Sequence, residues 1–139
     1  MRTVLDSSAL AKRYVEEVGS DEVEAALASA SDLGLCVTCT PEVVSALNRR
    51  RREGALTADE YRQAKAQLAA DLRDAVVLQL TPAVIVRSVS LLVCNVLRAM
   101  DALHVACAIE WHADLFVSAD VRQVEAARAA GLRVQCVGQ

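Results

Sequence analysis

Short apolar runs alternate along the chain with longer segments of helical periodicity. The runs are rich in Val and Leu and too short for helices, so each of them predicts a buried strand. They cover residues 2–5, 35–39, 76–80, 115–117 and 132–137.

The segments between these runs carry apolar residues at helical spacing, as Leu10 and Tyr14 do. Ser7 or Ser8 is the expected cap of the first helix, and Thr57 opens a later helix with the pattern of a capping box. The predicted helices cover residues 7–17, 21–31, 40–52, 57–72, 81–92, 97–111 and 121–130.

Strands that alternate with helices in this way are typical of a parallel sheet with helices on both faces. The sequence therefore predicts an α/β fold, a three-layer sandwich with a five-stranded parallel sheet. No linker, repeat or low-complexity tract divides the chain, so we expect a single domain over residues 1–139.

Composition excludes two other classes of protein. A hydrophobic content of 54%, with 5 Gly and 2 Pro, is too apolar for a disordered chain. The longest apolar stretch, residues 89–97, is interrupted by Ser90 and Asn95 and is shorter than the ~18 residues of a membrane span. The N-terminus has no apolar segment of the kind that a secretory signal needs, so a cytoplasmic location without membrane attachment is expected.

The net charge of −3 leaves no global attraction for nucleic acid, so any such binding needs a local basic patch. The run from Arg49 to Arg52 is the candidate patch. It would either contact phosphates or form a solvated, cationic helix end that the helix dipole stabilises, and the sequence leaves both open.

Five cysteines, an odd number in apolar surroundings, are expected to be small buried side chains with free thiols. Cys36 and Cys39 have the spacing of a redox or zinc motif. There is no second cysteine pair and no nearby His, so a structural role is favoured.

Four acidic residues are expected at one edge of the predicted sheet. Asp6 directly follows the first strand, Asp120 follows the fourth, and Glu42 lies in the first turn of the helix after the second. Asp101 lies early in the helix that leads to the fourth strand, among apolar neighbours. Because the carboxyl ends of parallel strands meet at one edge, these side chains are predicted to converge.

Converging carboxylates repel one another unless a cation lies among them. Oxygen ligands of this kind hold hard divalent ions such as Mg²⁺ or Mn²⁺. A metal ion held in this way activates water for attack on a phosphodiester, so the pattern favours metal-dependent hydrolysis. Each acid taken alone also has a simpler explanation, as a helix cap or as a first-turn residue that complements the helix dipole.

Four segments around these acids resemble the signature segments of PIN-domain ribonucleases, and in particular the VapC-type toxins of toxin–antitoxin pairs. They follow one another in the same order and span nearly the whole chain. The segments are Leu-Asp-Ser-Ser-Ala-Leu (5–10), Pro-Glu-Val-Val-Ser-Ala-Leu (41–47), Leu-Arg-Ala-Met-Asp-Ala-Leu-His-Val-Ala (97–106) and Leu-Phe-Val-Ser-Ala-Asp (115–120).

The resemblance implies a PIN-like fold and an endoribonuclease whose catalytic, metal-binding residues are Asp6, Glu42, Asp101 and Asp120. Asp6 and Asp101 would be the most dependable ligands of a Mg²⁺ or Mn²⁺ ion. The resemblance also implies an RNA substrate, a small antitoxin protein that neutralises the enzyme, and a homodimer.

Two departures from the family pattern bear on these expectations. Residues 89–96 are more apolar than the corresponding segment of the family, so we expect them to be buried or to line an interface. Val121 follows Asp120 where a basic residue is common, which weakens the expectation of RNA contacts at this point. His104 shares a helical face with Asp101 and is expected to pack beside the site.

Other classes of function remain open at this stage. A PIN-type RNA-processing nuclease without an antitoxin would use the same residues, and a metal-binding interaction module would not catalyse at all. A receiver-like module would need paired acids after the first strand and a late lysine, but Asp6 is followed by Ser7 and Ser8 and the last lysine is Lys65. A haloacid-dehalogenase-type phosphatase would need a second acid in place of Ser8.

Overall fold

The computed structural model describes all 139 residues and contains one five-stranded sheet. All four neighbouring strand pairs are parallel, and the order across the sheet is β3-β2-β1-β4-β5. The strands are β1 (Arg2–Leu5), β2 (Asp32–Cys36), β3 (Val76–Leu78), β4 (Leu115–Ser118) and β5 (Arg133–Cys136). The predicted fold class is confirmed.

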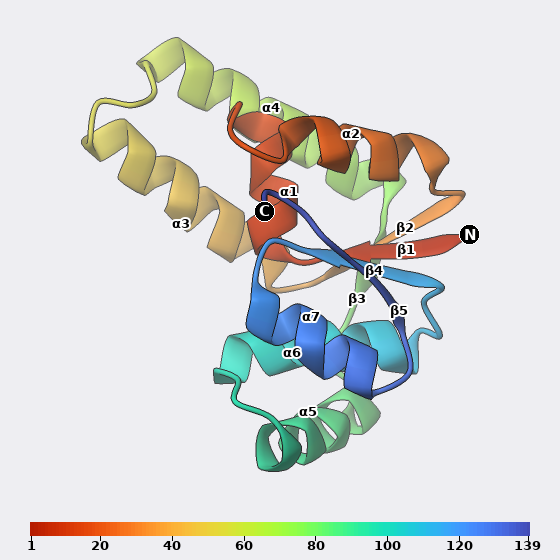
Figure 1. Ribbon diagram of the computed structural model, residues 1–139. Coiled ribbons are helices and arrows are strands. Elements are labelled where there is room, and N and C mark those ends of the chain that lie inside the picture. Colours follow the sequence, from red (N-terminus) through yellow and green to blue (C-terminus); the bar gives the residue numbers. More distant parts are fainter.

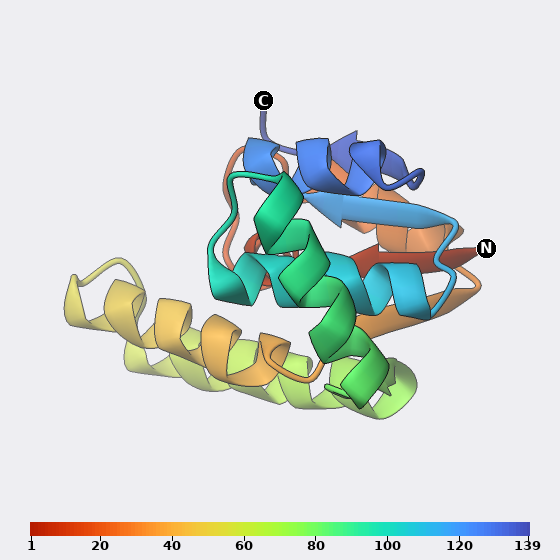
Figure 2. The same cartoon turned by 90° about the horizontal axis from the view of Figure 1, so that it is seen from below.

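Seven helices connect the strands and form a layer on each face of the sheet (Figure 1). The first four helices in the chain cover one face, and the last three cover the other (Figures 1 and 2). The helices are α1 (Ser7–Tyr14), α2 (Ser20–Ser29), α3 (Cys39–Arg52), α4 (Ala58–Asp74), α5 (Pro82–Cys94), α6 (Ala99–Glu110) and α7 (Val121–Ala129).

Two apolar clusters hold the layers together, one on each side of the sheet. Successive strand residues point to opposite faces, so Leu5 of β1 packs with α1 to α4, whereas Val4 packs with α5 to α7. Phe116 and Val117 of β4 divide between the two clusters in the same way. The core buries every residue of β4 and all of β1 except Arg2, as their apolar runs predict.

Helices α3 and α4 pack against each other and project beyond the sheet (Figures 1 and 2). Thr57 caps α4 with a complete capping box, in which its side chain accepts from the amide of Glu60 and Glu60 accepts from the amide of Thr57. Gly54 at the turn between the helices has a φ of 79°, a conformation that favours glycine. The long basic end of α3 is thereby held away from the sheet.

The second strand begins and ends three residues earlier than predicted. Asp32 and Leu33 pair with Arg2 and Thr3, although a polar residue and a nearby glycine interrupt the apolar pattern there. A Cβ atom at Gly34 would lie 2.6 Å from Cζ3 of Trp111, so the glycine makes room for the indole ring. Cys39, predicted in the strand, instead opens α3.

Three smaller expectations need correction. Asp6, rather than Ser7 or Ser8, caps α1, and this helix ends at Tyr14 instead of residue 17. All five thiols are free as predicted, but the thiol of Cys94 is exposed at the end of α5 and that of Cys136 is only partly buried.

None of the helices has the length and apolar content that a membrane span requires.

The apolar segment 89–96 is largely exposed. Val89, Val93 and Val96 are 55%, 81% and 79% exposed, so the expectation that the segment is buried is wrong for these side chains. Leu91 alone turns its side chain into the core. Helix α5 therefore packs on α6 along one face and presents valines on the other.

Candidate active site

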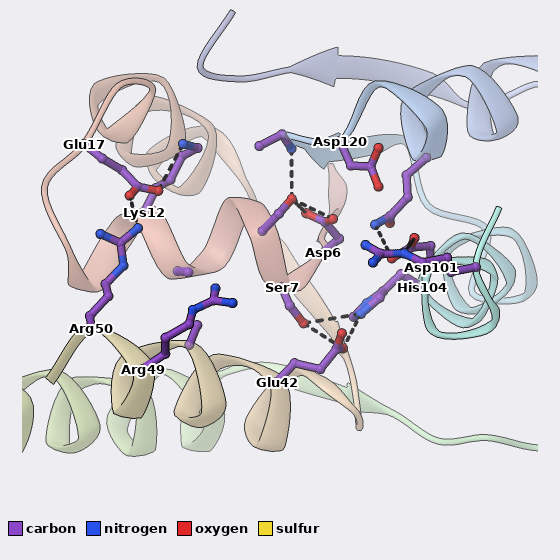
Figure 3. Close-up of a pocket in the computed structure, with 16 residues that line it drawn as sticks. Asp6, Ser7, Lys12, Glu17, Glu42, Arg49, Arg50, Asp101, His104 and Asp120 are labelled. Carbon is purple, nitrogen blue, oxygen red and sulfur yellow. Dashed lines mark hydrogen bonds and ion pairs between the residues drawn. The ribbon is translucent and has the colours of Figure 1, made fainter. Parts of the chain in front are cut away.

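The strand order reverses between β1 and β4, because the chain builds outward from β1 to β2 and β3 and then returns to the other side. In open parallel sheets, a cavity forms outside the carboxyl ends of the strands at such a switch point. A cavity of about 520 Å³ lies at this edge, and all four predicted acids line it: Asp6, Glu42, Asp101 and Asp120 (Figure 3).

Asp6 is the most buried of these acids, with 1% of its surface exposed. Its carboxylate accepts from the amide of Ala9 at 3.0 Å, from the hydroxyl of Ser8 at 2.8 Å and from the hydroxyl of Ser118 at 2.9 Å. Burial raises the pKa of Asp6 above its ordinary value, although the charge of His104 and these hydrogen bonds act in the opposite direction. The site thus contains a carboxylate for which a nearby cation would be stabilising.

Glu42 lies in the first turn of α3 and turns toward Ser7 and His104 (Figure 3). Its Oε1 atom lies 2.6 Å from Nε2 of His104 and accepts from the hydroxyl of Ser7 at 2.9 Å. Partial burial would raise the pKa of Glu42, but the hydrogen bond and the charge of His104 outweigh it, and the pKa is lowered. Glu42 is therefore an ionised group within a polar cluster.

His104 lies on α6 and is only 1% exposed, as expected for a histidine packed beside the site. Burial alone would lower its pKa, but the neighbouring Cys39 thiol, the hydrogen bond to Glu42 and the charge of Asp6 raise it well above its ordinary value. Its Nδ1 atom is buried and has no hydrogen-bond partner. The raised pKa favours the protonated ring beside the Glu42 carboxylate.

Asp101, at the start of α6, is 8% exposed and accepts from Nε2 of Gln123 at 3.0 Å. Its other oxygen lies 3.3 Å from Nε of Arg98, whose side chain is 83% exposed. Asp120 caps α7 by accepting from the amide of Arg122 at 2.9 Å. Asp6 and Asp120 are thus helix caps as well as members of the cavity.

Three residues of this network escaped the sequence analysis. Ser8 and Ser118 both hold Asp6, and Gln123 holds Asp101. Ser118 is fully buried in the structure. In the sequence, its one signal is that it is a polar residue at the end of an apolar strand, two positions before Asp120. Nothing in the local pattern marks Gln123, because its partner is 22 positions away in the sequence.

The oxygen ligands that the cavity offers are suited to a hard divalent cation. They are carboxylate oxygens, and one of them belongs to Asp6, a buried acid of raised pKa. Their side chains do not form a closed cluster, because no three His, Cys, Asp or Glu side chains lie close enough together to enclose one ion. The carboxylates instead bond to serine, glutamine and histidine side chains and to backbone amides. Asp6, Asp101, Asp120 and Glu42 are the residues that could hold a metal ion here.

Apart from the four predicted acids, basic side chains outnumber the one remaining acid, Glu17, on the wall of the cavity nearest α1 and α3. Lys12, Arg49 and Arg50 line it, together with Arg98 from the segment before α6 (Figure 3). An acidic centre with basic residues on its margin suits a ligand that carries phosphate groups, because the margin attracts the anion and the centre can bind a cation.

Comparison with known proteins identifies one family. The family model described as "PIN domain" matches residues 3–129 of the chain. A search of curated proteins finds no significant match.

Solved structures of similar fold are distant in sequence. VapC20 of Mycobacterium tuberculosis, described as a Sarcin-Ricin loop cleaving toxin, is 18% identical, with 94% of this chain and 95% of that chain covered and a TM-score of 0.70. VapBC2 of Rickettsia felis, bound to a DNA fragment from its promoter, is 11% identical, with 99% of each chain covered and a TM-score of 0.68. A toxin–antitoxin complex of Klebsiella pneumoniae is 14% identical, with 87% and 88% covered and a TM-score of 0.67.

Proposed function

The chain belongs to the PIN domain family, and from this premise we propose that it is a Mg²⁺- or Mn²⁺-dependent endoribonuclease that acts as the toxin of a toxin–antitoxin pair. The observation that carries the proposal is the convergence of Asp6, Glu42, Asp101 and Asp120 on one cavity at the switch point of the sheet. These acids come from four separate segments of the chain, and helix capping accounts for only two of them.

In this proposal Asp6 and Asp101 are the principal metal ligands, and Asp120 and Glu42 complete the acidic set. A divalent ion, when bound, supplies a water of lowered pKa and neutralises charge on the phosphodiester. Ser8 and Ser118 fix the orientation of the Asp6 carboxylate, and Gln123 does the same for Asp101. These side chains are therefore already ordered before the substrate binds.

His104 positions Glu42 in this arrangement. Its ring is buried and bonds to the Glu42 carboxylate, so that the acid is held at the mouth of the cavity rather than free in solvent. The hydroxyl of Ser7 donates to the same oxygen, so two hydrogen bonds orient the Glu42 carboxylate. A carboxylate held in this way can orient a water molecule or a ribose hydroxyl beside the scissile bond.

The partners are part of the same proposal. Similar folds occur in chains described as VapBC complexes and as a toxin–antitoxin complex. This supports a small antitoxin protein as a partner of the present chain, and the resemblance to VapC-type toxins supports a homodimer. The basic margin of the cavity, with Arg49 and Arg98, supports RNA as the substrate.

The proposal is tested by incubating the purified protein with total RNA in the presence of Mg²⁺ and, separately, in EDTA. Discrete fragments are expected with Mg²⁺ only. Asp6→Asn and Asp101→Asn should each reduce the cleavage rate by at least about 100-fold, as expected when a ligand of a catalytic metal is lost.

Asp74→Asn is the matched control, because Asp74 is an exposed acid at the end of α4, far from the cavity in the fold. Expression in a bacterial host extends the test, since a toxin should arrest growth in its unsubstituted form and not as Asp6→Asn. Equal cleavage by the unsubstituted protein and both site variants would contradict the assigned site.

A further inference from the structure

The four consecutive arginines of α3 have different partners. The guanidinium of Arg50 pairs with Glu17, whose carboxylate also contacts Nζ of Lys12 at 3.1 Å (Figure 3). The guanidinium of Arg51 lies over the ring of Tyr61, 5.4 Å from its centroid. Two of the four positive charges are therefore engaged within the chain.

Arg49 and Arg52 have no such partner. Both are exposed, and neither guanidinium makes a hydrogen bond or an ion pair within the chain. They are three residues apart, so they share one face of the helix. Glu42 lies on the same side of α3, which is turned toward the site. The two free guanidinium groups therefore follow one another along α3 away from the acidic cavity.

A second cavity runs along this face. Its volume is about 640 Å³, and it lies between α3 and the segment that leads into α6. Arg49, Arg52 and Arg98 line it, and it shares Glu42, Arg49 and Arg98 with the acidic cavity. The two cavities therefore adjoin, one with the four predicted acids in its lining and the other with three arginines and Glu42.

We propose that Arg49 and Arg52, with Arg98, form a phosphate-binding track that holds the backbone of a single-stranded RNA next to the nucleotide at the acidic cavity. This inference rests on the proposed function and assigns the path that the substrate takes beyond the cleavage site. Arg50 and Arg51 are not part of the track.

The dimensions and charges of the track suit an RNA backbone. A helix rises about 1.5 Å per residue, which puts Arg49 about 10 Å and Arg52 about 15 Å along the axis from Glu42. This reach covers more than one nucleotide. Because the protein carries a net charge of −3 and the cavity centre is acidic, a polyanion needs the unpaired guanidinium groups of Arg49 and Arg52 to approach the site. Guanidinium groups also match the geometry of phosphate oxygens.

The test compares Arg49→Gln/Arg52→Gln with the unsubstituted protein by fluorescence anisotropy in EDTA, where no metal-dependent cleavage occurs. The probes are labelled oligouridylates of about ten and about three nucleotides, since only the longer one can span both cavities. We expect the double substitution to weaken binding of the longer probe about tenfold at low salt. The slope of log K against log salt should fall by about 1.4, which is the value for two phosphate contacts on a single strand. The shorter probe carries fewer phosphates, so its salt slope with the unsubstituted protein should be smaller than that of the longer probe.

Arg51→Gln/Arg73→Gln is the matched control, because it removes the same charge from two exposed positions that line neither cavity. It should bind both probes as the unsubstituted protein does. Equal losses in the two double variants would mean that only net charge matters and would overturn the proposal. Unchanged affinity and salt slope in Arg49→Gln/Arg52→Gln would overturn it too, and would leave an acidic protein segment as the ligand of these arginines.

The same experiment separates this inference from the proposed function. If the unsubstituted protein cleaves RNA in Mg²⁺ but binding does not depend on Arg49 and Arg52, the track is wrong and the nuclease stands. If binding depends on these arginines but no cleavage occurs, the track stands and the nuclease is wrong. Absence of binding by the unsubstituted protein would overturn the track.

Discussion

The hydroxyl of Ser118 donates to Oδ2 of Asp6 at 2.9 Å, across the junction where β4 pairs with β1. The same hydroxyl oxygen accepts from the amide of Asp120 at 2.9 Å. One buried side chain thus links two of the four acids of the site, and it does so from the end of a strand that the core holds fixed.

Ser118→Ala should therefore impair the site without a change of fold. The loss of a donor disfavours the charged form of Asp6, so the pKa of this acid should rise further above its ordinary value. We expect the cleavage rate to fall, with the larger loss on the acidic side of the pH profile, because protonation of Asp6 then begins at a higher pH.

The measurement is a pH–rate profile of RNA cleavage for both proteins. Ser90→Ala, at an exposed position of α5, is the control and should leave the profile unchanged. A uniform loss of rate at every pH would show that Ser118 does not act through the ionisation of Asp6.

Asp6→Asn should stabilise the fold when no metal ion is present. Because burial raises the folded-state pKa above the ordinary value of 3.8, ionisation of Asp6 destabilises the folded state. This cost is absent at pH values below 3.8 and is complete above the folded-state pKa. An amide removes it, so the melting temperature at neutral pH should rise in EDTA.

Saturating Mg²⁺ should reduce or reverse this difference, because only the unsubstituted protein gains free energy from binding the ion. Differential scanning fluorimetry in EDTA and in Mg²⁺ measures both effects. A variant that melts lower than the unsubstituted protein in EDTA would contradict the argument from burial.

Asp71 of α4 ties the first helix to the projecting helical pair. It accepts from Nε of Arg13 at 2.7 Å, from Nη2 of the same residue at 3.1 Å and from the hydroxyl of Tyr14 at 2.7 Å. Burial would raise the pKa of Asp71, but the hydrogen bonds from Arg13 and Tyr14 outweigh it, and the pKa is lowered. Its contribution to stability is therefore present above the ordinary value of 3.8 and is lost as the pH falls through the folded-state pKa.

Asp71→Asn should lower the free energy of unfolding by about 1–3 kcal/mol at neutral pH, since it breaks a bidentate, partly buried ion pair. Urea denaturation at neutral pH and again well below pH 3.8 tests this, with the two proteins expected to converge in acid. A difference that is the same at both pH values would exclude the ionised carboxylate as its cause.

The fold could be predicted from the sequence because its strands are short, continuous apolar runs, as at β1 and β4. Such runs are typical of strands covered on both faces. The strand at Asp32–Cys36 was misplaced because its pairing to β1 includes a charged residue and a glycine. The reason for that glycine is its contact with Trp111, which is remote in the sequence.

The acids of the site were accessible for a similar reason. Asp6 and Asp120 directly follow strands, and the parallel topology brings such positions to one edge. Their partners were not accessible, because Ser118 and Asp6 are 112 positions apart, and His104 and Glu42 are 62 positions apart. The local pattern of apolar and polar residues does not predict contacts between positions so far apart in the sequence.

The strand order also fixes when the site is completed during synthesis. Asp6, Glu42 and Asp101 leave the ribosome before β4 does, but Asp120 joins them only after β4 has paired with β1 on the side opposite β2. A nascent or truncated chain that ends before β4 therefore carries three of the four acids but lacks Asp120 and the buried Ser118 that bonds to Asp6. A ribosome that makes this protein is exposed to a complete site only when nearly the whole chain has been translated.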